Sequence, residues 1–217
     1  SWTKGSVHIF RLLDALHQKS IDIILVHVGS WGDEPNRPIQ ELINGLEVRD
    51  IQYYENIEDI IQKEKPNLVF FLSLDVLIHR MFNRYCKYYQ VPTVNLYHGV
   101  HSVFYTLDSK KKYLISHWVR LFKRTKTLLR YSLFEYLLCL YKTKAPFSVW
   151  LELILDIIKK LLGKSIETAR EDAKTDFICV FNDFDFDHAK HKFQIPEDKI
   201  KVVGSPDIMK FNGLEGK

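Results

Sequence analysis

Cysteine is scarce in this sequence, and its few cysteines are not spaced as pairs. Cys86, Cys139 and Cys179 lie far apart, each in apolar surroundings. Such spacing argues against a disulfide framework and against a zinc site. We therefore expect buried thiols in a reducing compartment.

The sequence also lacks segments that would direct it across or into a membrane. It has no signal-peptide pattern at its N-terminus, no uninterrupted run of about 18 apolar residues, and no Asn-x-Ser/Thr sequon. We therefore expect a cytoplasmic protein. Any membrane attachment is expected to be peripheral, at the cytoplasmic face.

Several common motifs are missing as well. The absence of Gly-x-Ser-x-Gly, a Walker loop and Gly-x-Gly-x-x-Gly disfavours serine hydrolases, P-loop nucleotidases and dinucleotide enzymes, and we expect no cofactor. Asp183, Asp185 and Asp187 alternate after Asn182, but aspartates at a helix start are explained by capping and the helix dipole. No metal site is predicted, because the glycine and the distal glutamate of a calcium loop are missing.

What the chain does contain is an alternation of strand and helix patterns. With 217 residues and 46% hydrophobic content it can bury one large core. Short β-branched or aromatic runs predict strands at 21–28, 48–54, 67–73, 91–97, 176–181 and 199–203. Helical patterns occupy 6–19, 39–46, 57–65, 76–90 and 185–193. This order predicts an α/β fold: a Rossmann-like, doubly wound parallel sheet of at least six strands with helices on both faces.

Loops at the carboxyl ends of those strands are expected to build a ligand crevice. They are 29–37, 73–75, 98–102 and 182–183. His98 follows a predicted strand directly, Gly99 permits close backbone approach, and histidine is a natural acid or base near neutral pH. A histidine that only satisfies loop carbonyls is the alternative, and His101 could have either role.

The first predicted helix opens with a second candidate site. Gly5 and Ser6 precede His8, and the helix N-terminus would suit an anionic ligand such as a pyrophosphate. A solvent-facing His8 in the first turn is the alternative. Residues 2–5 look like a loop that should follow a first strand, so we expect that strand to be missing from this sequence.

A basic helical insertion separates the predicted strands at 91–97 and 176–181. Between residues 109 and 164 there are 13 basic and three acidic residues, whereas the whole chain has a net charge of +4. One predicted helix segregates apolar from basic side chains. Its apolar side includes Trp118 and Phe122, and its basic side is formed by Arg120, Lys123, Arg124, Lys126 and Arg130.

This segregation is typical of a helix at an anionic membrane surface. Two other interpretations remain open. The helices could be ordinary surface helices with a solvated basic face, or they could bind nucleic acid through phosphates. Nucleic acid is the less favoured partner, because no recognised nucleic-acid motif accompanies the charges.

The end of the chain resembles the end of the N-terminal domain of GT-B glycosyltransferases. In that family an Ala-Asp strand precedes a helix, and a Lys-Ile-x-Val strand leads to the second domain. The matching residues here are Thr175, Asp176, Asn182, Lys199, Ile200, Val202, Gly204 and Pro206. His98-Gly99 is similar to the His-Gly of family members that build cell-surface polymers. Gly5 to Phe10 is similar to the family's first glycine-rich loop.

The resemblance implies an acceptor-side α/β domain at 1–107 and 175–205. It also implies an insertion at 108–174, and a linker at 206–217 to a C-terminal domain that binds most of the nucleotide-sugar donor. Catalysis would then involve His98 and His8. The implied substrate-binding residues are Gly5, Ser6, Gly99, His101, Asn182, Gly204 and Ser205.

The implied function is transfer of a sugar from a nucleotide sugar to a glycan or lipid-linked acceptor in surface polysaccharide synthesis. Two alternatives remain open. The 203–206 segment also resembles nucleotide-sugar 2-epimerases, which are isomerases. The basic helices could instead make the chain a non-catalytic membrane or nucleic-acid adaptor.

Overall fold

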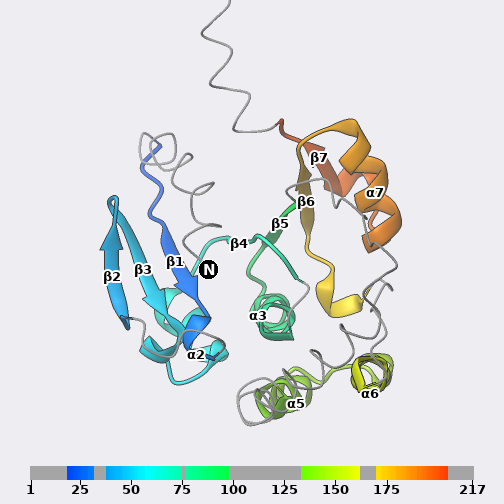
Figure 1. Ribbon diagram of the computed structural model, residues 1–217, viewed down its shortest axis with the longest axis horizontal. Helices are drawn as coiled ribbons and strands as arrows, with labels where there is room; N and C mark the ends of the chain where they lie inside the picture. The colour runs from blue at the N-terminus through cyan, green and yellow to red at the C-terminus, as the bar shows by residue number, and fades with distance from the viewer. Residues whose placement is uncertain (1–18, 32–37, 75–76, 98–132, 162–169, 205–217) are drawn as a thin grey trace, which may run out of the picture. The chain divides into compact units, whose positions relative to one another are not determined.

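The computed structural model describes residues 19–31, 38–74, 77–97, 133–161 and 170–204 (Figure 1). The chain divides into two compact units. One contains residues 1–63 and 204–217, and the other contains residues 64–203. Each unit has its own sheet, so each is described by itself.

The first unit contains a three-stranded mixed sheet. Strand β1 (Ile24–His27) pairs in parallel with β3 (Leu46–Asp50), and β2 (Gln40–Ile43) pairs antiparallel with the other edge of β3. Leu46 and Val48 on β3 are buried, and the partly buried residues Ile23, Leu25 and Ile43 pack against them. A short 3-10 helix, η2 (Ile51–Tyr53), and α2 (Ile57–Glu64) follow β3.

The predicted helix at 39–46 is wrong, because this segment forms a β-hairpin. Asn44 and Gly45 have φ values of 50° and 80°, and Ile43 pairs with Leu46 across the turn. A two-residue turn with both φ values positive matches the twist of the flanking strands, and Asn-Gly is the sequence that most readily adopts it. The turn chemistry therefore outweighed the helical spacing of the apolar residues.

The second unit is an α/β unit built on a four-stranded, all-parallel sheet in the order β4-β5-β6-β7. The strands are β4 (Val69–Phe71), β5 (Thr93–Tyr97), β6 (Phe177–Val180) and β7 (Ile200–Val202). The α-helices are α3 (Leu77–Tyr88), α5 (Phe134–Lys142), α6 (Phe147–Leu161) and α7 (Asp183–Phe193). The 3-10 turns η5 (Glu171–Ala173) and η6 (Glu197–Lys199) complete the unit.

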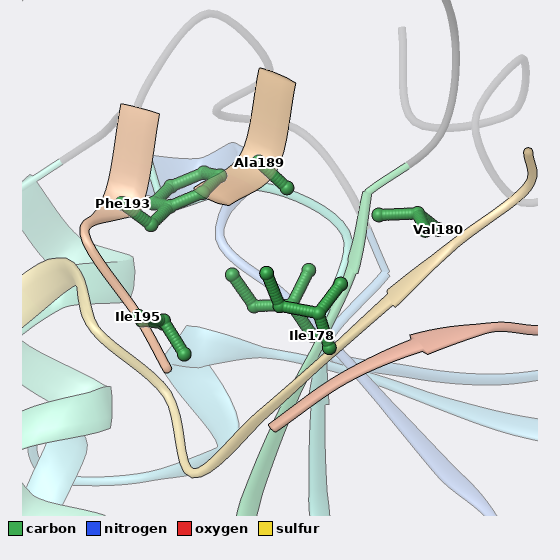
Figure 2. Packing of buried hydrophobic residues seen from close by; sticks show 6 residues of the cluster. Ile178, Val180, Ala189, Phe193 and Ile195 are labelled. Carbon is green, nitrogen blue, oxygen red and sulfur yellow. The ribbon is translucent and has the colours of Figure 1, made fainter. Parts of the chain in front are cut away.

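Helices α3 and α7 cover the same face of this sheet. Phe71 of β4 and Ile178 of β6 lie in one row across the sheet, because both pair in register with Asn95. The Phe71 ring contacts that of Phe82 on α3, with centroids 5.7 Å apart. Ile178 packs with buried residues of α7 and β7, as Figure 2 shows. Four consecutive strands joined by right-handed crossovers place their helices on one face in this way.

The opposite face of the sheet is more open. Phe70 and Phe177, which flank Val94 in the next row, are 60% and 43% exposed. A parallel sheet is normally covered on both faces. Among the residues that the structure describes, the four parallel strands and their flanking helices are compatible with a Rossmann-like fold.

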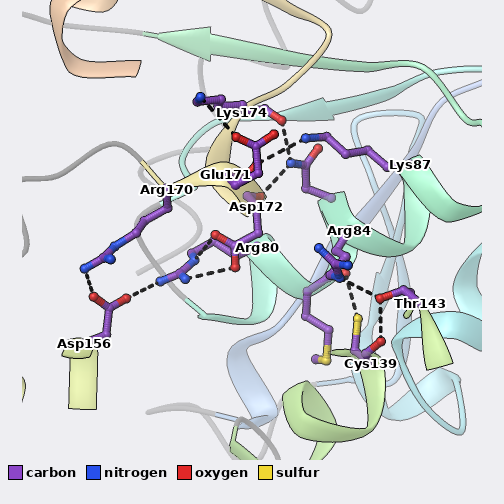
Figure 3. A network of polar contacts seen from close by, with 12 residues as sticks. Arg80, Arg84, Lys87, Cys139, Thr143, Asp156, Arg170, Glu171, Asp172 and Lys174 are labelled. Atoms are coloured by element: carbon purple, nitrogen blue, oxygen red, sulfur yellow. Dashed lines mark hydrogen bonds and ion pairs between the residues drawn. The ribbon is translucent and has the colours of Figure 1, made fainter. Parts of the chain in front are cut away.

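A buried ion network attaches the insertion to α3 (Figure 3). Arg80 donates two hydrogen bonds to Asp172, both 2.9 Å long, and a third of 2.8 Å to Asp156 of α6. Arg170 donates to the other carboxylate oxygen of Asp156. All four residues are at most 6% exposed. Two positive and two negative charges thus compensate one another inside the unit.

The strand predictions hold for β1, β3, β4, β5, β6 and β7, although the strands are shorter than their apolar runs. Residues 51–53, predicted as strand, form η2, because Asp50 caps a 3-10 turn by accepting a hydrogen bond from Gln52 N. The sequence predicts one sheet of at least six parallel strands. The described strands instead form two sheets, of which the all-parallel one has four strands.

Candidate functional site

A histidine and an aspartate meet at the carboxyl edge of the first unit's parallel strands. His27 ends β1, Asp50 ends β3, and the two residues are paired in register. The Nδ1 atom of His27 lies 3.3 Å from Oδ2 of Asp50. The Asp50 residue is 2% exposed and the His27 side chain 12% exposed. The carboxyl edge of parallel strands is where α/β proteins commonly place ligand sites.

The short 3-10 helix η1 (Gly29–Trp31), which follows β1, folds back onto this pair. Ser30 donates from its backbone N–H to Asp50 Oδ2 at 3.3 Å, and its hydroxyl donates to Oδ1. Gln52 N also donates to Oδ1, at 3.0 Å. The buried carboxylate is therefore satisfied by several donors, as a charge in such a position must be.

Glycine is required in η1 because the histidine ring lies directly over it. A Cβ atom on Gly29 would stand 2.0 Å from His27 Cε1. In the present arrangement Gly29 N–H donates to His27 Nδ1 at 2.9 Å. That bond makes Nδ1 an acceptor and places the proton of the neutral ring on Nε2.

This arrangement can hold or move a proton. Protonation of Nδ1 would replace the bond from Gly29 by a charge-assisted bond to Asp50. Ser30 donates to Asp50 and not to His27, so the three residues do not form the relay that activates a serine nucleophile. His27 is therefore a candidate acid or base, and Asp50 is the group that would hold the ring in its protonated form.

A second histidine lies at the carboxyl end of β4 in the other unit. His79, in the first turn of α3, has its Nδ1 atom 2.7 Å from the carbonyl oxygen of Ser73. A carbonyl oxygen can only accept, so Nδ1 carries the proton and Nε2 of the neutral ring is a hydrogen-bond acceptor. This is the tautomer that a general base requires.

Two of the predicted substrate-binding residues belong to this sheet edge. Asn182 caps α7: its Oδ1 accepts from Asp185 N at 2.8 Å, and its Nδ2 donates to the Asp185 carboxylate at 2.9 Å. Gly204 follows β7 with φ at +75°, a conformation that other L residues rarely adopt. Both residues thus have a structural role at the predicted edge, and a role in substrate binding stays a prediction for each.

The remaining predicted site residues lie outside the described residues. They are Gly5, Ser6, His8, His98, Gly99, His101 and Ser205, together with the membrane candidates Trp118, Arg120, Phe122, Lys123, Arg124, Lys126 and Arg130. Strand β5 ends at Tyr97, so His98 does come directly after a parallel strand, as predicted.

Sequence reasoning missed His27 and His79. Each has a signal that depends on exact strand and helix ends: His27 is the last residue of its strand, and His79 is in the first turn of the helix after β4. Within the described ranges no three His, Cys, Asp or Glu residues are grouped so that they could hold a metal ion. The helices in these ranges include no candidate for a membrane span.

Comparison with known proteins finds nothing similar: no protein-family model, no curated protein and no solved structure matches the chain.

Proposed function

We propose that this chain is the acceptor-side half of a glycosyltransferase with a Rossmann-like GT-B architecture. The observation that carries the proposal is the strand–helix–strand unit formed by β6, α7 and β7. Its residues coincide with those of the GT-B resemblance. Asp176 precedes β6, Asn182 caps α7, and Gly204 leaves β7 in the left-handed conformation.

The sheet supports a doubly wound architecture. All four strands of the second unit run in parallel, and α3 and α7 cover one face only. In a doubly wound sheet the other face, which carries Phe70 and Phe177, would be covered by helices that follow further strands. Four strands with all their carboxyl ends at one edge suit a site assembled from several loops.

Transfer at this edge would proceed by attack of an acceptor hydroxyl on the donor sugar. His98, directly after β5, would take the hydroxyl proton while the oxygen bonds to the anomeric carbon. As this bond forms, the bond from the anomeric carbon to the diphosphate breaks, and the nucleoside diphosphate leaves with the electron pair. Gly5, Ser6 and His8, which precede or open the first predicted helix, stay predicted site residues for this reaction. A second domain would hold the donor and close over it.

The insertion between β5 and β6 supports a surface-polymer or lipid-linked acceptor. It is basic in sequence, and its described helices carry exposed apolar side chains. Such an element has an evident use if the acceptor is held at a membrane. A nucleotide-sugar epimerase acts on a soluble substrate and would not need a membrane-binding element. A non-catalytic membrane adaptor would need one.

Product analysis separates these functions. The protein from the complete reading frame is incubated with a panel of nucleotide sugars, with and without a membrane lipid extract, and the products are followed by ³¹P and ¹H NMR. A transferase releases nucleoside diphosphate only when an acceptor is present. An epimerase changes the sugar without any acceptor. If neither the sugar nor the nucleotide changes, with or without lipid, the proposal is contradicted. The non-catalytic adaptor would then be the remaining alternative.

A further inference from the structure

Helix α5 is apolar on two opposite sides. Its inner stripe is fully buried and consists of Tyr136, Cys139 and Leu140. At about 100° per residue the opposite side is formed by a second apolar set. That set is Phe134 (58% exposed), Leu137, Leu138 and Tyr141 (77% exposed).

Helix α6 repeats this arrangement over 15 residues. Its inner stripe, spaced four and three residues apart, is Val149, Leu153 and Asp156, all at most 3% exposed. Its outer stripe has the same spacing of three and four residues. That stripe is Phe147 (78% exposed), Leu151, Ile154, Leu155 and Ile158. A helix that is apolar all round normally has a partner on every side.

Each inner stripe includes one residue that contacts α3. Cys139 Sγ lies 3.8 Å from the carbonyl oxygen of Met81, and Asp156 accepts a hydrogen bond of 2.8 Å from Arg80. On each helix the outer stripe lies opposite the residue that contacts α3, and we call the two outer stripes taken together the α5–α6 outer face. A set of nine exposed large apolar side chains on two successive helices marks an interaction surface.

The charges around this face favour an anionic partner. Lys142 at the end of α5 and Lys144 in the following turn are exposed, and Lys159 lies near the end of α6. The three acidic residues of the two helices are all at least partly buried. Asp156 is paired with Arg80, Glu152 is half-buried, and burial raises the pKa of the half-buried Glu135.

A second copy of the chain would suit the face less well. Pairing two such faces would bring like-charged lysines together at its margin, and the whole 109–164 segment has ten more basic than acidic residues. An anionic bilayer satisfies both features. Its acyl boundary accepts the apolar stripes, and its headgroups pair with the lysines.

We propose that the α5–α6 outer face lies on the surface of an anionic bilayer. The outer stripes enter the headgroup–acyl boundary, and Lys142 and Lys144 contact lipid phosphates. This proposal rests on the proposed function and deepens it, because a domain held at the bilayer surface can reach a lipid-linked acceptor. Binding itself needs no substrate and no turnover, so it can be measured whatever reaction the protein catalyses.

The test is sedimentation of the full chain with vesicles of phosphatidylcholine alone, or of phosphatidylcholine with roughly one third phosphatidylglycerol. We expect retention on the anionic vesicles only. The triple variant Leu151→Gln, Ile154→Gln, Ile158→Gln should lose about tenfold or more in apparent affinity. Lys142→Gln with Lys144→Gln should also weaken binding, as should salt. The control is Phe184→Gln on α7, an apolar residue outside the face that is more exposed (69%) than the three substituted ones, and it should leave binding unchanged.

A labelling experiment avoids reliance on the triple variant. Ile154→Cys and Phe184→Cys, each carrying a polarity-sensitive fluorophore, are titrated with the same vesicles. The label at 154 should shift to the blue with anionic vesicles, and the label at 184 should not. The proposal is overturned by undiminished binding of a folded triple variant, by equal binding to neutral vesicles, or by absence of wild-type binding. It is also overturned by a dimer in solution that the triple variant dissociates.

Discussion

Arg80 and Asp172 are 92 positions apart in the sequence and are joined by two parallel hydrogen bonds of 2.9 Å, from Nε and Nη2 to the two carboxylate oxygens. This bidentate pair connects α3 with η5, which leads into β6. The pair also holds the long insertion between β5 and β6 against α3, next to the point where the chain returns to the sheet. The chain between β5 and β6 is fixed at Asp156 and Asp172 to a helix that packs on the sheet.

Removing Arg80 should be strongly destabilising. In Arg80→Met, Asp172 and Asp156 would lose their shared cation while they remain buried, and the cost of breaking a buried pair in this way is about 3–5 kcal/mol. Urea denaturation of the two proteins, followed by circular dichroism, measures the difference in the free energy of unfolding.

The control is a salt bridge on α2 between the exposed Lys63 and the partly buried Asp59, in which Nζ and Oδ2 are 2.8 Å apart. Lys63→Met removes the same charge sign from an exposed position and should cost much less than Arg80→Met, because water and salt screen an exposed ion pair. Equal effects of Arg80→Met and Lys63→Met would show that the buried network does not contribute as described.

Gly29→Ala should be destabilising through a clash with one side chain. Because the new Cβ would stand 2.0 Å from His27 Cε1, the ring must move and give up its bond from Gly29 N–H. We expect a loss of about 1–3 kcal/mol, as is typical of overpacking. In a His27→Ala background the same substitution should cost much less, and a double-mutant cycle by thermal denaturation measures this coupling.

Gly45 is the control for this cycle. Its φ is +80° and a Cβ atom added there would meet no other atom within 4 Å, so Gly45→Ala is unfavourable for conformational reasons alone. Its cost should be the same with and without the His27 ring. A Gly29→Ala cost that is equally independent of His27 would contradict the steric account.

Cys86 should make stability depend on pH in the alkaline range. Burial raises the pKa of its thiol to about 12 from an ordinary value of 9.0, with a smaller contribution from Asp176. The folded state therefore keeps its proton while the unfolded chain loses one, so this contribution to stability is complete below pH 9 and is lost as the pH rises toward 12. We compare the free energy of unfolding of wild type with that of Cys86→Ala at pH 7.5 and at pH 10.5. Between these two pH values, wild type should lose roughly 2 kcal/mol more than the variant.

Urea denaturation of both proteins at the two pH values measures these free energies of unfolding. Lysine and tyrosine titrate alike in the two proteins, so their effect is removed when the variant is subtracted from wild type. A difference between the proteins that is the same at both pH values would mean that the thiol is accessible to water. Native Cys86 should likewise resist alkylation by iodoacetamide near neutral pH.

The sequence was sufficient for the parallel part of the fold because strand runs and helical spacings agree there. The runs around Phe71, Val94 and Ile178 are short and apolar, and the intervening patterns match α3 and α7. It failed at 39–46, where apolar spacing and turn chemistry disagree and Asn44-Gly45 decided the outcome. The division of the strands into two sheets depends on long-range pairing, which a local pattern does not contain.

For the candidate site, the sequence predicted the edge of the sheet but not the contacts between its residues. Strand ends indicate the carboxyl edge, and Asn182 and Gly204 do lie there. The contact between His27 and Asp50 depends on the register of β1 against β3, over 23 positions of sequence. The outer stripes of α5 and α6 were likewise not predictable, because an apolar residue in a helix can be buried or exposed, and only its packing partner decides which.

The central claim is that the loop after β5 carries out glycosyl transfer. The most direct measurement compares wild type with His98→Ala, in the protein from the complete reading frame, for transfer of radiolabelled sugar from a nucleotide sugar into a lipid extract. Thermal denaturation of both proteins is recorded alongside. We predict transfer by wild type and a loss of about 10²–10⁴-fold in the variant, the range for a general base, with little change in the denaturation midpoint. Equal rates in the two proteins, or no transfer by wild type from any nucleotide sugar of the panel, would contradict the claim.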